Sequence, residues 1–269
     1  MRAGSGGLAP GQIDPTSGRL AHGGAVPGEV TSGGATNGAA LANAARASRR
    51  WGDLRWRAIS ALVLAPIALA CVWSGGPVFV ALVGAALVLL VAEWARLCRD
   101  AHAPLMLAGG TLWLLLAAAA LLFVRADGAI GRANLLFLLL LIWASDIGAY
   151  LIGRLVGGKR LAPLISPGKT WSGAVGGIAA ALAVGCGADW LLPGGGLARV
   201  ALVALVLCVI GQLGDLAESW AKRRFGVKDS GRLIPGHGGL LDRLDALVAV
   251  APFAALLALC LGRGVLLWQ

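Results

Sequence analysis

Several stretches of about 20 consecutive apolar residues constrain this chain more than any other feature of its sequence. Seven of them lie at about 58–74, 77–95, 104–124, 133–152, 172–191, 198–214 and 246–262. An α-helix needs about 20 apolar residues to cross the hydrocarbon core of a bilayer. Only 13% of the 269 residues are charged, about half the share in soluble domains, and the mean hydropathy is +0.80. We therefore predict an all-α fold, a polytopic membrane helical bundle of about seven transmembrane helices.

The first 54 residues differ from the rest, because they are rich in Gly, Ala and Ser and contain few large apolar residues. They lack the apolar core of a secretory signal. We expect residues 1–54 to be a disordered tail, and residues 55–269 to form one membrane-embedded domain. The five cysteines are scattered, with no CxxC pair, which favours small buried side chains over zinc sites or disulfides.

Basic residues alternate between the connections of the predicted helices. They precede the first helix and follow the second, fourth and sixth, whereas the other connections are short and carry few charges. Loops rich in Lys and Arg remain in the cytoplasm, so we expect the long loops 154–171 and 215–245 there. The net charge of +10 is attributed to the membrane surface rather than to nucleic acid, because no basic stripe with interleaved aromatic residues occurs.

Lysine is confined to the two long polar loops, although arginine is the usual cation of this chain. The chain has 19 Arg and four Lys, and the loops hold ten of the 23 basic residues. All four lysines lie there: Lys159, Lys169, Lys222 and Lys228. Membrane topology alone would not prefer lysine, whereas a compact ammonium group suits phosphate. The distribution indicates a phosphate-containing ligand at these loops.

The segment "SPGKT" in the first loop supplies three candidate phosphate ligands, Ser166, Lys169 and Thr170. It precedes a predicted helix, whose free amide groups would favour an anion. It is not a Walker motif, because Pro163 stands where the first glycine is required and no strand is predicted before it.

Four aspartates lie at predicted cytoplasmic ends of apolar helices: Asp146, Asp215, Asp242 and Asp245. Acids so placed are costly and are functional candidates. Asp242 and Asp245 are three residues apart and share a helix face, which Asp215 joins if its helix packs alongside. Converging carboxylates repel one another unless a cation lies between them, and Mg²⁺ binds such oxygens together with phosphate. There are alternatives to a functional role for these acids. Asp146 could simply pair with the nearby Arg154, and Asp242 and Asp245 could only stabilise a helix N-terminus.

The segment from Ser219 to Asp245, "SWAKRRFGVKDSGRLIPGHGGLLDRLD", holds six basic residues, three acids and a histidine. It resembles the signature of the phosphatidate cytidylyltransferases, which contains Ser, Lys-Arg, Lys-Asp, a small residue, Pro, His-Gly-Gly and Asp-Arg-x-Asp at fixed spacings. The upstream segments "SDIGAYLIGR", "ISPGKTWSGAVGG" and "GDLAES" also resemble that family. The resemblance covers about residues 55–262. Two positions depart from the pattern: Ala221 replaces a larger aliphatic residue, and Ser172 replaces an acidic one.

The resemblance implies that the protein transfers CMP from CTP to phosphatidate, giving CDP-diacylglycerol and pyrophosphate in phospholipid biosynthesis. It implies one or two Mg²⁺ ions and allows a homodimer. Together with the alternation of basic loops, it places the protein in the inner (plasma) membrane with its active site on the cytoplasmic side. The expected catalytic residues are Asp215, Lys222, Arg223, Lys228, Asp242 and Asp245, of which the three aspartates bind metal. The expected substrate contacts are Asp146, Ser166, Lys169, Thr170, Ser219, Asp229, His237, Gly238, Gly239 and Arg243.

Two other classes of membrane protein were weighed against this interpretation. A CDP-alcohol phosphotransferase would carry a DGxxAR…GxxxDxxxD pattern. Only "DGAIGR" at Asp127 matches part of it. A transporter would place charges around a cavity at the membrane midplane and show paired, interrupted helices. Here the polar residues gather at one surface, and no internal repeat is evident.

Overall fold

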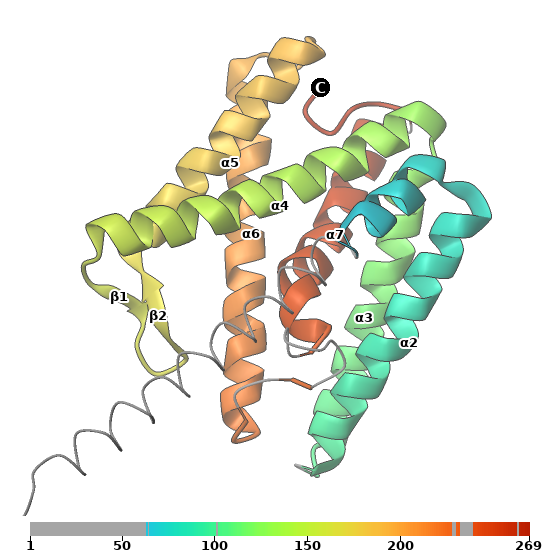
Figure 1. Ribbon diagram of the computed structural model, residues 1–269. Helices are drawn as coiled ribbons and strands as arrows, with labels where there is room; N and C mark the ends of the chain where they lie inside the picture. Colours follow the sequence, from blue (N-terminus) through green and yellow to red (C-terminus); the bar gives the residue numbers. More distant parts are fainter. Residues whose placement is uncertain (1–62, 64, 101, 228–229, 232–238, 263) are drawn as a thin grey trace, which may run out of the picture. The chain divides into compact units, whose positions relative to one another are not determined.

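The computed structural model describes residues 63, 65–100, 102–227, 230–231, 239–262 and 264–269. Over these residues the chain is almost entirely helical (Figure 1), which confirms the predicted all-α class. A short helix, Ala65–Ser74, precedes α2 (Gly76–Asp100), α3 (Pro104–Arg125), α4 (Gly128–Val156), α5 (Trp171–Leu191), α6 (Leu197–Arg224) and α7 (Leu241–Leu261). The predicted tail, residues 1–54, lies outside the described residues and stays a prediction.

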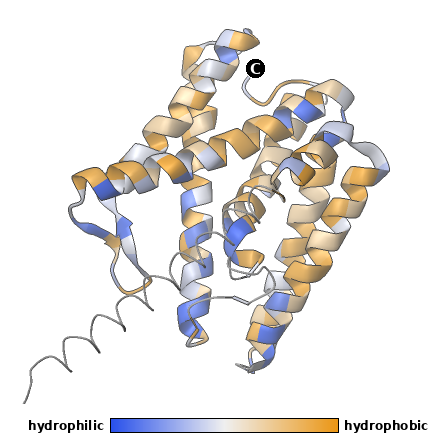
Figure 2. Ribbon diagram, in the orientation of Figure 1, coloured by the Kyte–Doolittle hydropathy of each residue, from blue (hydrophilic) through white to orange (hydrophobic). Residues whose placement is uncertain are grey.

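Helices α2 to α7 are each long and apolar enough to cross a membrane. The helices are hydrophobic along most of their length (Figure 2). Many of their large apolar side chains are exposed, and Leu105, Leu155 and Trp190 are among the most exposed. Such a surface is unfavourable in water but suits contact with lipid. The chain is therefore a multi-pass membrane protein, as predicted. Of the first predicted span, 58–74, the described part is the short helix Ala65–Ser74.

Helix α6 is longer than its predicted span, 198–214, because it continues to Arg224. The prediction that Asp215 ends a membrane helix is therefore wrong. Hydropathy marks only the apolar part of a helix, whereas backbone hydrogen bonding continues through polar residues. The predicted loop 215–245 thus begins as ten further helical residues, and these place its first polar side chains at helical spacing.

A two-stranded antiparallel hairpin connects α4 to α5. Strand β1 (Arg160–Ala162) pairs with β2 (Ser166–Thr170), so the segment "SPGKT" is itself a strand. The expectation that no strand precedes this segment is therefore wrong. A P-loop needs a buried strand leading into a glycine-rich loop, and this antiparallel hairpin does not supply one. Thr170 caps α5, because its hydroxyl oxygen accepts a hydrogen bond from the amide of Gly173 at 3.1 Å.

Glycines allow the helices that carry the polar residues to approach one another closely. A Cβ atom on Gly148 of α4 would lie 2.7 Å from the carbonyl oxygen of Gly176 in α5. A Cβ on Gly214 of α6 would lie 2.2 Å from the Cβ of Ala249 in α7. Small residues permit such contacts between membrane helices. The contact at Gly214 matters for function, because the next residue, Asp215, is thereby brought close to α7.

The connection between α3 and α4 is fixed by buried polar side chains. Arg125 donates hydrogen bonds to the carbonyl oxygens of Val72 at 2.7 Å, Trp73 at 3.1 Å and Gly128 at 3.1 Å. Asn134, in the first turns of α4, donates to the carbonyl oxygen of Val265 at 3.0 Å. It also accepts a hydrogen bond from the amide of Leu267 at 2.8 Å. The segment after α7 is thus held against the start of α4.

Candidate active site

Three carboxylates from two helices form the centre of the candidate site. Asp215 and Glu218 lie on α6 and Asp245 lies on α7, and one oxygen from each lies within 4.8 Å of the others. Residues three apart share a face of a helix, so both acids of α6 are directed toward α7. The close packing at Gly214 completes the cluster.

Glu218 shows that this cluster suits a cation. Among the described residues, its Oε1 atom is buried and has no hydrogen-bond partner, while Oε2 lies 2.6 Å from the ammonium group of Lys222. Three neighbouring carboxylates repel one another, and a buried unpaired oxygen costs free energy. Mg²⁺ prefers carboxylate oxygens as ligands, so the donor set fits the predicted metal. Glu218 was missing from the predicted ligands, although its position three residues after Asp215 was a visible signal.

Asp242 is engaged differently from the other acids. Its Oδ1 atom lies 2.7 Å from the ammonium group of Lys222. Its oxygens also accept hydrogen bonds from the amide of Ser230, at 3.2 and 3.3 Å, and from the amide of Gly239, at 3.1 Å. Asp242 therefore holds the backbone at Ser230 and Gly239, and its predicted role as a metal ligand stays a prediction. Lys222 bridges it to Glu218.

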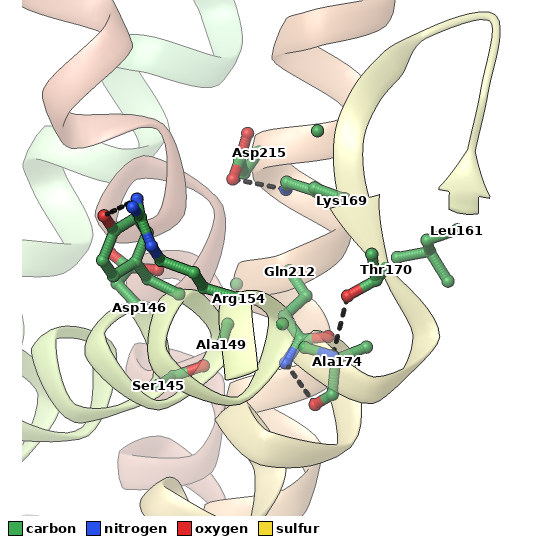
Figure 3. Close-up of a pocket in the computed structure, with 15 residues that line it drawn as sticks. Ser145, Asp146, Ala149, Arg154, Leu161, Lys169, Thr170, Ala174, Gln212 and Asp215 are labelled. Atoms are coloured by element: carbon green, nitrogen blue, oxygen red, sulfur yellow. Dashed lines mark hydrogen bonds and ion pairs between the residues drawn. The ribbon is translucent and has the colours of Figure 1, made fainter. Parts of the chain in front are cut away.

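The β1–β2 hairpin brings the first polar loop to the acid cluster. Lys169 of β2 forms an ion pair with Asp215 (Figure 3). Arg223, near the end of α6, donates a hydrogen bond to the carbonyl oxygen of Ile165 at 3.2 Å, which ties the hairpin to the same helix. The two segments in which the sequence gathers its lysines therefore meet in space.

A cavity of about 450 Å³ lies beside the cluster, between α4, α5, α6 and the hairpin (Figure 3). Its walls include Asp146 and Arg154 from α4, Lys169 and Thr170 from β2, and Asp215 from α6. Asp146 and Asp215 line the same cavity, and like charges so placed repel one another. The cavity thus joins cationic side chains, which suit phosphate, to the edge of the acid cluster.

The remaining predicted site residues are distributed around this centre. Ser166 pairs with Ala162 in the hairpin, and the hydroxyl of Thr170 is used to cap α5. Ser219 lies half-buried on α6, and Arg243 is exposed in the first turn of α7. Four predicted residues lie outside the described part of the chain: Lys228, Asp229, His237 and Gly238.

Glu93 is a second acid that the sequence analysis did not single out. It lies in α2 and its side chain is completely buried. Its carboxylate accepts hydrogen bonds from the amide of Leu241 at 2.8 Å, the amide of Leu240 at 3.0 Å and the hydroxyl of Ser230 at 3.4 Å. An acid inside an apolar stretch was the signal that could have identified it.

Comparison with known proteins identifies the family. The model of the cytidylyltransferase family matches residues 103–261, more than half of the chain. A protein of Brucella suis biovar 1 named phosphatidate cytidylyltransferase is 48% identical over 170 residues, which are 63% of this chain and 61% of that protein. Proteins of the same name from Staphylococcus saprophyticus and Haemophilus influenzae are 45% and 44% identical, over 47% and 46% of this chain and 49% and 44% of their own lengths. The matched region thus spans less than two thirds of these relatives. The chain belongs to the cytidylyltransferase family.

Proposed function

We propose that this protein transfers CMP from CTP to phosphatidate, giving CDP-diacylglycerol and pyrophosphate. A phosphate oxygen of the lipid forms a bond to the α-phosphorus of CTP, and the bond from that phosphorus to the bridging oxygen of the β-phosphate breaks. Pyrophosphate leaves with those electrons. The observation that carries the proposal is the cluster of Asp215, Glu218 and Asp245 beside a cavity lined by Lys169 and Arg154, in a multi-pass membrane protein. The names of the three relatives support the choice of substrates.

This reaction requires the site to compensate negative charge and does not require a strong base. The phosphate of the lipid is already anionic at neutral pH, so it needs no proton removed by the protein. The site must instead bring two polyanions together. Lys169, on the cavity wall, suits contact with a phosphate group, and Lys222 forms ion pairs with Glu218 and Asp242. Lys228 and Arg223 remain proposed phosphate ligands.

Asp215, Glu218 and Asp245 would hold Mg²⁺, with Asp242 as a further proposed ligand. Bound there, the metal would neutralise charge at the α-phosphate and on the departing pyrophosphate. The protein's own contribution is to fix three carboxylates from α6 and α7 at one point. The ion pair between Lys169 and Asp215 also keeps a phosphate-binding cation within reach of that point.

We propose further that the site faces the cytoplasm from the plasma membrane. The alternation of basic loops supports this orientation, because positively charged connections stay inside. CTP would then arrive from the cytosol, while the apolar surface of the bundle keeps the acyl chains of phosphatidate in the bilayer. A homodimer, implied by the family resemblance, stays a prediction.

The test uses purified full-length protein in detergent with phosphatidate, Mg²⁺ and CTP labelled at the α- or the γ-phosphate. We expect label from the α-position in the lipid extract and label from the γ-position in pyrophosphate. Diacylglycerol in place of phosphatidate should give neither product, and Asp215→Asn serves as the inactive control. Lipid labelling from γ-labelled CTP, or no labelling by the unaltered protein, would overturn the proposal.

A further inference from the structure

The first two turns of α7 carry two acids of the site, Asp242 and Asp245, but the helix lacks a capping side chain of its own. The helix begins after Leu240, whose side chain cannot accept a hydrogen bond. The first amides of a helix have no partner within the helix and need acceptors from elsewhere. Here the acceptor comes from α2, since the two oxygens of Glu93 receive the amides of Leu240 and Leu241.

Burial makes this contact specific. Glu93 is 0% exposed, and a carboxylate so buried is tolerated only when hydrogen bonds satisfy it. The two amides and the Ser230 hydroxyl supply three such bonds. A negative charge at a helix N-terminus is also favoured by the helix dipole. The acid and the helix start therefore depend on each other.

Two glycines before α7, Gly231 and Gly239, leave room for this carboxylate. A Cβ atom on Gly231 would lie 2.5 Å from Oε1 of Glu93, and one on Gly239 would lie 3.0 Å from the same atom. The amides of Ser230 and Gly239 donate to Asp242. The described residues on either side of this connection thus contact one acid of α2 and one acid of α7.

We propose that Glu93 is a positioning residue that fixes the first turn of α7 and, through it, sets Asp242 and Asp245 against α6. Its contacts are with Ser230, Leu240 and Leu241, whereas the metal and substrate contacts of the proposed function belong to other residues. The inference rests on that proposed function only in what the acids of α7 do. The placement of α7 by Glu93 is tested separately below.

The main test compares Glu93→Gln with the unaltered full-length protein in detergent. Glutamine has one acceptor oxygen, and its NH₂ group would face an amide that is also a donor. We expect the Mg²⁺ concentration for half-maximal turnover to rise by about 10- to 100-fold, the range found when groups that orient metal ligands are removed. Hydrogen–deuterium exchange in peptides covering residues 239–248 should become faster. Mn²⁺ binding, followed by its electron paramagnetic resonance signal, should weaken in parallel.

Asp189→Asn is the matched control, because Asp189 also accepts a backbone amide, that of Gly195 at 3.2 Å, at the connection between α5 and α6. It should leave the Mg²⁺ dependence and the exchange at 239–248 unchanged. A residue with a merely structural role would lower the melting temperature without changing the Mg²⁺ dependence of the folded fraction. That outcome for Glu93→Gln would overturn the inference.

Two further variants keep the inference testable if Glu93→Gln does not fold. Gly231→Ala inserts a methyl group against the carboxylate and should raise the Mg²⁺ requirement in the same direction. Ser230→Ala removes only the 3.4 Å hydrogen bond and should give a smaller rise, about two- to fivefold. Normal Mg²⁺ dependence in both variants would overturn the inference. An inactive unaltered protein would instead count against the proposed function, while exchange and Mn²⁺ binding would still decide the role of Glu93.

Discussion

The two ends of the helical bundle bury polar side chains in opposite ways. Where α3 meets α4, Arg125 and Asn134 pair with backbone groups of neighbouring segments. Where α6 meets α7, like charges gather, since Asp215, Glu218 and Asp245 lie within 4.8 Å of one another. Lysines pair with some of their oxygens, but Oε1 of Glu218 has no hydrogen-bond partner among the described residues.

The difference separates stability from chemistry. At the first end each polar group is matched by a neutral partner, so the contact stabilises the fold without needing a ligand. At the second end the repulsion between carboxylates costs free energy, which a bound cation would offset. Substitutions at the two ends should therefore have opposite effects on melting and on turnover.

The largest effect is expected from Asp215→Asn and Asp245→Asn. Each removes one charge from the cluster, and turnover should fall about a thousandfold or more, because several kcal/mol of transition-state stabilisation are lost. The double variant should be far from additive, since both residues act at one site. Asp245→Asn should not lower the melting temperature measured without Mg²⁺, because it removes a like charge from the cluster and no ion pair. Near-normal turnover and unchanged Mg²⁺ dependence in Asp245→Asn would mean that the cluster is structural.

Arg125→Met should have the next largest effect, on stability rather than turnover. The substitution keeps an extended side chain but leaves three carbonyl oxygens without their donor. We expect a loss of about 3 kcal/mol in the free energy of unfolding. The measurement is a chemical or thermal melt in detergent, with turnover normalised to the folded fraction. A large drop in turnover per folded molecule would break the separation between the two ends.

Glu218→Gln should produce a smaller change at the site. The amide keeps one oxygen for the metal and for Lys222 but removes a charge from the cluster. Mg²⁺ affinity should weaken by about 10- to 100-fold, while maximal turnover at saturating Mg²⁺ should recover most of its value. Titration of turnover against Mg²⁺ measures both quantities. An unchanged titration would show that Glu218 serves only to hold Lys222.

The smallest effect is expected from removal of residues 1–50, because every motif of the site lies beyond them. The shortened protein should enter the membrane and keep its turnover within about twofold. Membrane fractionation followed by the same assay provides the measurement. Normal membrane insertion with lost turnover would contradict this prediction and would show that residues 1–50 are needed for the reaction.

The sequence predicts the fold class well, because the requirement for about 20 apolar residues per span leaves few alternatives. It predicts less well where helices end. The apolar pattern stops near residue 214. Helix α6 nevertheless continues to Arg224, because its backbone hydrogen bonding does not depend on apolar side chains. That extension puts Asp215, Glu218 and Lys222 on adjacent turns of one helix. Glu218 was not predicted as a ligand because its position was assigned to a loop.

Contacts between distant segments were also difficult to predict. The ion pair between Lys169 and Asp215 joins two polar loops that the sequence had linked only by their shared lysines. Glu93 is 147 residues from Leu240, whose amide it accepts, and no local pattern signals such a partner. An acid inside an apolar stretch indicated that Glu93 has a structural or functional role. Its hydrogen-bond donors could not be predicted, because they depend on how α2 packs against α7.

The length of α6 has a consequence for kinetics. Its 28 residues would extend about 42 Å, against about 30 Å for the hydrocarbon core of a bilayer. The helix therefore presents its polar residues near the boundary between lipid and water. For the proposed reaction, one substrate diffuses laterally in two dimensions and the other in three. The rate should then follow the mole fraction of phosphatidate in the micelle or bilayer, and dilution of that lipid with inert amphiphile should slow turnover at constant bulk concentration.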